Sequence, residues 1–146
     1  MKPSPKPPKP WITASLLAAT LGLGLLAAGA AQADTRATQR KSLEKYTPYL
    51  EAPVDDFMFW SLYKWQLVGP QKVVVWSTVK DAYLLTVETP CTQLEWANGI
   101  GVTSQQSHQV TRRFDYVTVG SDRCRIDESQ PIDIARMNRD RGAAGK

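Results

Sequence analysis

Histidine and cysteine are scarce in this sequence of 146 residues, which contains one His and two Cys. Because these residue types supply most ligands of zinc and other transition-metal sites, no metal site is expected, and nothing indicates a cofactor. A large charge excess is also missing. Lys and Arg number 18 and Asp and Glu 14, and removal of Lys2, Lys6 and Lys9 with the N-terminal segment described next leaves 15 against 14. This balance does not predict a nucleic-acid-binding surface.

The N-terminal residues have the pattern of a secretory signal. Met1–Pro10 carries three lysines and no acidic residue, and the stretch from Trp11 to Ala31 is uncharged and rich in Leu, Ala and Gly. Small residues follow at Ala31-Gln32-Ala33, as signal peptidase requires. We therefore expect residues 1–33 to be a signal peptide that is cleaved after Ala33. The alternative is an uncleaved anchor, because about twenty apolar residues can cross a bilayer.

This signal places the mature chain in the periplasm or outside the cell. No twin-arginine pair precedes the apolar stretch, which favours the general secretion route. No cysteine occurs before Cys91, so an N-terminal lipid on cysteine is excluded. After cleavage we expect no membrane span.

The two cysteines predict a structural disulfide. Cys91 and Cys124 are the only pair, and both would reach an oxidising compartment. A bond between them closes a loop of about 34 residues and would stabilise the fold by roughly 3–4 kcal/mol. The alternative is a reactive thiol at Cys124, whose pKa the flanking Arg123 and Arg125 could lower.

The mature chain is expected to be mainly β, with one domain over residues 54–135. A polar segment, 34–53, precedes it and could form a short helix over Thr38–Tyr46, whereas the tail 136–146 is expected to be disordered. The clearest signal is an antiparallel hairpin formed by Lys72–Thr78 and Ala82–Glu88. Further strands are expected over Phe57–Leu67, Ile100–Thr103, Phe114–Val119 and Cys124–Ile126. Together these predict a small antiparallel, curled sheet or partial barrel with one short N-terminal helix and one disulfide.

The order of several short motifs resembles a known family. These motifs are Ala82-Tyr83-Leu84-Leu85, Cys91 with Leu94, Phe114-Asp115, and Cys124-Arg125-Ile126 running to Pro131-Ile132-Asp133. The pattern is similar to a family of small exported proteobacterial proteins classed as a domain of unknown function, over about Val54 to Asp133. Some members are lipoproteins, and this sequence differs from them in lacking the lipidated cysteine. The resemblance implies an exported domain with paired cysteines, and it implies no activity.

Candidates for catalysis are few. His108 has serines nearby in the sequence and Asp115 further on, so a small hydrolase that uses His108 is one hypothesis. No Gly-x-Ser-x-Gly motif accompanies it, and a solvated loop histidine is the alternative. The acidic pairs Asp55-Asp56 and Asp127-Glu128 would point to opposite faces of a strand, which does not suit shared proton chemistry. Asp133 stands among apolar residues and could accept backbone hydrogen bonds or pair with an arginine.

The aromatic residues are the remaining candidate for function. Phe57, Phe59, Tyr63 and Trp65 alternate with apolar neighbours, so both faces of this segment would be apolar. Either other elements cover both faces, or one face is an interaction surface, for which Trp60, Tyr63 and Trp65 are the candidates. We expect most of these rings to be buried, with one or two at a rim.

These observations favour an exported, non-catalytic envelope protein that serves as a binding or structural module. Exposed rings could stack on the sugars of an envelope glycan or anchor an envelope protein. The small hydrolase that uses His108 is the alternative. No residue is assigned a catalytic role.

Overall fold

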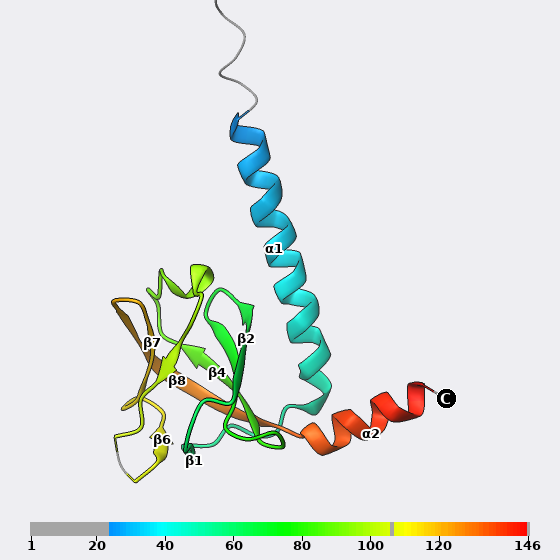
Figure 1. Cartoon of the computed structure of the whole chain (residues 1–146), viewed down its shortest axis with the longest axis vertical. Helices are drawn as coiled ribbons and strands as arrows, with labels where there is room; N and C mark the ends of the chain where they lie inside the picture. Colours follow the sequence, from blue (N-terminus) through cyan, green and yellow to red (C-terminus); the bar gives the residue numbers. More distant parts are fainter. Residues whose placement is uncertain (1–23, 106, 146) are drawn as a thin grey trace, which may run out of the picture.

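The predicted hairpin lies near the centre of a six-stranded antiparallel sheet in the computed structural model, which describes residues 24–105 and 107–145. The hairpin consists of β3 (Lys72–Trp76) and β4 (Ala82–Val87). The strand order is β2-β3-β4-β8-β7-β5, where the other strands are β2 (Lys64–Gly69), β5 (Gly101–Val102), β7 (Tyr116–Val119) and β8 (Asp122–Ile132). The sheet curls into a half-barrel (Figure 1). The long strand β8 connects its two parts, since β4 pairs with residues 126–132 of β8 and β7 pairs with residues 122–125.

A separate two-stranded ribbon packs into the half-barrel. It consists of β1 (Asp56–Met58) and β6 (Gln109–Thr111), paired antiparallel. Two backbone contacts fix it to β8: an isolated bridge between Val54 and Ser129, and a 2.6 Å hydrogen bond from Arg113 N to Ile126 O. The ribbon thus places Phe57 and Val110 in the interior of the curled sheet, where both are buried.

Alternate residues of β3 belong to two different cores. Val73 and Val75 point into the half-barrel, where they pack with Leu85 and with the Cys91–Cys124 disulfide. Val74 and Trp76 point outward into a second core that includes Tyr46, Leu84 and Met137. Since successive side chains of a strand alternate between faces, the run of three valines fits a strand that is covered on both sides.

Two helices cover the outer face of the sheet. Helix α1 (Gly24–Tyr46) packs on β2, and its last residue, Tyr46, contacts the Trp76 ring of β3 edge-on. The short 3₁₀ helix η1 (Thr47–Tyr49) follows α1. The side of α1 that faces the sheet carries Gln39, Ser42, Leu43 and Tyr46. These positions recur at intervals of three and four residues, as expected for one face of a helix. The helix that the sequence predicted over Thr38–Tyr46 is therefore part of a longer one. The predicted signal peptide, 1–33, lies largely outside the described residues.

The expectation of a disordered tail is wrong. The chain after β8 forms α2 (Ile134–Ala144), which begins at a cap: the Asp133 carboxylate accepts a 2.8 Å hydrogen bond from Arg136 N. Ile134 and Met137 are buried against the sheet. A cap and two apolar side chains one turn apart thus dock the helix, although the other residues of the segment are polar or small.

The single strand predicted over Phe57–Leu67 is also wrong. The segment divides into β1 and β2, because each half pairs with a different partner. Met58 pairs with Gln109 of β6, whereas Tyr63 N donates to Trp76 O at the start of the pairing with β3.

The fold class itself is confirmed: the protein is mainly β, with a curled antiparallel sheet and one disulfide. The remaining short element between β4 and β5 is a 3₁₀ helix, η2 (Leu94–Trp96). The helices differ from the expectation of one short N-terminal helix, since a long N-terminal helix and a second, C-terminal helix are present. Among the described residues, no helix combines the length and apolarity needed to span a membrane.

Candidate functional site

The three candidate aromatic residues differ in exposure. Trp60 is 67% exposed and Tyr63 is 62% exposed, and both lie in the connection between β1 and β2. Trp65 lies in β2, is half-buried and packs against the inner core. The neighbouring rings of Phe57 and Phe59 are buried. The expectation that most of these three rings are buried is therefore wrong, because two of them lie in an exposed connection outside the sheet. The candidate surface retains Trp60 and Tyr63, and Trp65 belongs to the packing of the half-barrel.

The Trp60 ring stacks on the imidazole of His108. Their ring centroids are 4.0 Å apart and their planes differ by 20°. Both side chains are exposed, so the pair presents a flat, aromatic surface to solvent. We call these two side chains the Trp60–His108 platform. This pairing could not be predicted from the sequence, because the two residues are distant in the chain and the β1–β6 ribbon brings them together.

The backbone under the platform is fixed and unusual. Phe59 N donates a 2.7 Å hydrogen bond to His108 O, which ties the two segments directly below the rings. Ser107 and His108 have φ angles of 45° and 61°, in the left-handed region that residues with a Cβ seldom occupy. Such conformations cost roughly 1–2 kcal/mol per residue. The cost must be offset by surrounding contacts, and strained residues of this kind are concentrated at functional sites.

The loop that carries His108 is polar and uncharged. The sequence from Ser104 to Gln109 contains only serine and glutamine besides the histidine. Among the described members, Ser104, Gln105 and Ser107 are exposed. Hydroxyl and amide groups beside a flat ring form a surface that suits a neutral, hydroxyl-rich ligand.

The structure does not assemble a serine–histidine–aspartate triad. Asp115 is only 1% exposed, and its carboxylate accepts hydrogen bonds from Thr103 Oγ1 and Thr111 N, each at 2.8 Å. Within residues 24–105 and 107–145, neither imidazole nitrogen of His108 hydrogen-bonds to a serine hydroxyl or a carboxylate. Asp115 instead acts as a structural acceptor that joins the ends of two loops.

The other acidic candidates have structural surroundings. Asp55 forms an ion pair and a side-chain hydrogen bond with Arg112. Asp127 and Glu128 are successive residues of β8 at an irregularity in its pairing with β4, where Thr86 pairs with Glu128 but Val87 pairs with Ile126. The strict alternation of faces that the sequence predicts for this pair is therefore interrupted. Asp133 caps α2, which matches the prediction that it accepts backbone hydrogen bonds. In the part of the chain that the structure describes, no cluster of His, Cys, Asp or Glu could hold a metal ion.

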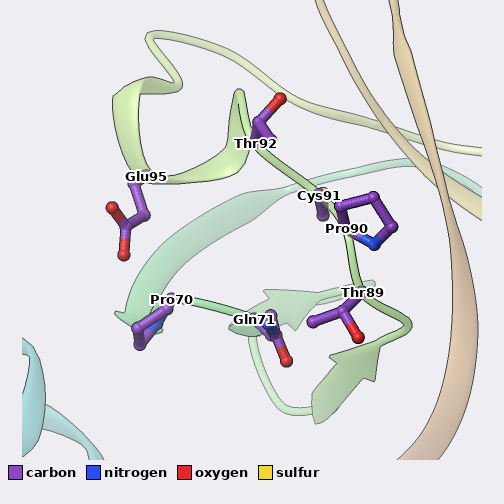
Figure 2. Close-up of a pocket in the computed structure, with 7 residues that line it drawn as sticks. All are labelled: Pro70, Gln71, Thr89, Pro90, Cys91, Thr92 and Glu95. Carbon is purple, nitrogen blue, oxygen red and sulfur yellow. The ribbon is translucent and has the colours of Figure 1, made fainter.

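A pocket of about 330 Å³ lies beside the disulfide (Figure 2). It separates the β2–β3 turn, at Pro70 and Gln71, from the segment between Thr89 and Glu95. Glu95 is the only titratable side chain in its lining, since Cys91 is bonded to Cys124. The segment is held by Asp122, whose Oδ2 accepts from Thr92 Oγ1 at 3.2 Å. The pocket therefore contains no pair of groups that could act as acid and base.

Comparisons with known proteins show the family of the chain. A search of curated proteins and a search of solved structures each return no match. A family profile, described as a family of unknown function, matches residues 12–146, which is nearly the whole chain. This match is longer than the expected resemblance over about Val54 to Asp133, since it also covers residues 12–53 and 134–146. The protein belongs to this family of unknown function, DUF6491.

Proposed function

We propose that the protein is an exported, non-catalytic module that binds a glycan of the cell envelope through the Trp60–His108 platform. The observation that supports this most strongly is the platform itself. A large ring that is 67% exposed is nevertheless stacked at 4.0 Å on a second ring, over a backbone held in a costly conformation. Fixed, flat rings suit stacking on the apolar face of a sugar, because little side-chain freedom is lost on binding.

A neutral glycan is favoured over a charged ligand by the surroundings of the platform. The serine and glutamine side chains beside His108 offer hydroxyl and amide groups, which match the donors and acceptors of sugar hydroxyls. Met58, which pairs with Gln109 next to His108, is 51% exposed and adds apolar surface near the platform. The envelope location is supported by the signal-like N-terminus and by the disulfide, a bond typical of oxidising compartments.

A co-sedimentation assay with peptidoglycan sacculi, whose uncharged amino-sugar chains are the expected contact, tests this function. We expect the protein to sediment with the sacculi, and we expect Trp60→Ala to weaken binding at least about tenfold, as is typical of a central aromatic contact. Trp96→Ala is the matched control, because Trp96 is equally exposed, at 69%, on the η2 segment. Equal binding by the wild type and Trp60→Ala, or a loss caused only by Trp96→Ala, would refute the platform.

The hydrolase alternative requires a separate measurement. His108→Ala and the wild type would be compared on ester, peptide and glycan substrates. The proposal predicts no turnover by either protein. An activity that is present in the wild type and disappears in His108→Ala would overturn the non-catalytic assignment.

A further inference from the structure

A second cleft lies between α1 and the β2–β3 turn, away from the platform. Its volume is about 310 Å³, at the lower end of the range for small-molecule sites. One part of its lining consists of residues without a polar side chain: Leu43, Val68, Gly69 and Pro70. The other part is cationic, with Arg36 and Arg40 on α1 and Lys72 at the start of β3.

The three cations of this cleft have no acidic partner among the described residues. The ion pairs of residues 24–105 and 107–145 are Arg112–Asp55 and Arg125–Glu88, both elsewhere in the fold. No carboxylate contributes to the lining of the cleft either. Like charges gathered around a partly enclosed space repel one another and raise the local positive potential, which a bound anion would relieve.

A buried amide beside the cleft gives an independent sign of a ligand site. Gln39 lines the cleft and is only 8% exposed, and its Oε1 atom has no hydrogen-bond partner. The polar neighbours on the same side of α1 are paired with each other: Tyr46 Oη donates to Gln66 Oε1, and Gln66 Nε2 donates to Ser42 Oγ. A buried acceptor without a partner is unfavourable, so a hydroxyl-bearing ligand would supply the group that the protein lacks.

From these features we propose that the cleft binds the head group of an acidic phospholipid. The phosphate would lie among Arg36, Arg40 and Lys72, since charge-assisted hydrogen bonds to phosphate favour guanidinium and ammonium groups. Because protein atoms cover Gln39 Oε1, the amide would rotate toward the cleft to accept a hydrogen bond from a glycerol hydroxyl. The first methylene groups would contact Leu43 and Val68. The apolar half of the lining favours a lipid over a free phosphate ion, which would leave that half solvated.

Isothermal titration of the purified protein with dihexanoyl phosphatidylglycerol, below its micelle-forming concentration, tests the proposal. We expect saturable binding with one site, weakened about tenfold by Arg40→Gln and by Lys72→Gln, because each change removes a charged donor. Lys41→Gln is the matched control: it removes one charge from the neighbouring, exposed position of the same helix, outside the lining. Lys41→Gln should bind like the wild type.

Two further ligands and one further variant separate the parts of the proposal. Dihexanoyl phosphatidylcholine, with no net charge, and glycerol 3-phosphate, with no chains, should each bind at least about tenfold more weakly. Gln39→Leu should unfold at a higher temperature than the wild type but bind the lipid more weakly. Equal binding of phosphatidylcholine, equal binding of glycerol 3-phosphate, an equal loss in Lys41→Gln, or no binding of the acidic lipid would each overturn the proposal.

Discussion

Removal of the disulfide should cost a large part of the stability of the domain. Cys91 and Cys124 are 33 positions apart, so the bond closes a loop of about 34 residues. The chain-entropy relation then gives a loss of roughly 13 cal/mol/K from the unfolded ensemble, or about 4 kcal/mol at 25 °C. Both cysteines are also buried in the inner core, so replacement by alanine removes packing contacts in addition.

The double variant Cys91→Ala/Cys124→Ala tests this value. With an unfolding entropy of about 2.1 cal/mol/K per residue, a loss of about 4 kcal/mol lowers the melting temperature by roughly 15 °C in a chain of this size. Thermal unfolding followed by circular dichroism measures the difference, and wild-type protein treated with a reductant should show a similar decrease. A decrease of less than about 4 °C in both samples would refute the assigned role of the bond.

Three other changes test the structural assignments. Asp133→Ala should lower the free energy of unfolding by about 1 kcal/mol through loss of the α2 cap, measured by urea denaturation. Asp115→Asn should cost about 2 kcal/mol, because one acceptor for Thr103 Oγ1 or Thr111 N is replaced by a donor; unchanged stability would contradict this. Burial raises the pKa of the Tyr46 hydroxyl, against a smaller opposing effect of Arg141. The folded state thus holds this proton more strongly, so stability should decline above about pH 10, less steeply in Tyr46→Phe.

The strands that were predicted correctly are those whose pattern reflects local pairing. The β3–β4 hairpin joins two runs of β-branched and aliphatic residues by a short turn, so both its pairing and its register are local. The disulfide was predicted because only one pairing of two cysteines exists. The half-barrel follows from several short strands that share one core in a small domain.

The errors arise where distant contacts decide the structure. The alternation from Phe57 to Trp65 continues across a change of pairing partner, from β6 to β3, which no local pattern records. The α2 helix depends on Ile134 and Met137 docking on the sheet, since a polar segment of this length would be marginal alone. Asp133 is a usable signal in the sequence, because an Asp directly before the first apolar residue of a helical pattern, here Ile134, often begins a helix.

The Trp60–His108 platform could be predicted only in part. The sequence indicates Trp60 as a candidate because both faces of the segment from Phe57 to Trp65 are apolar. It did not indicate His108 as its partner, because the contact depends on Met58 pairing with Gln109, a register set by tertiary structure. The sequence therefore suggests His108 as a catalytic base, whereas in the structure its imidazole stacks on the Trp60 ring.

The most direct test of the account is a nuclear magnetic resonance titration of the protein with soluble peptidoglycan fragments. The indole N–H signals of Trp60, Trp65, Trp76 and Trp96 report from one sample, and they range from exposed to buried positions. The platform predicts that the Trp60 signal and the ring signals of His108 shift and saturate together, while the signals of Trp76 and Trp96 stay unchanged. Saturating shifts at Trp96 with none at Trp60, or no shift at any indole, would contradict it.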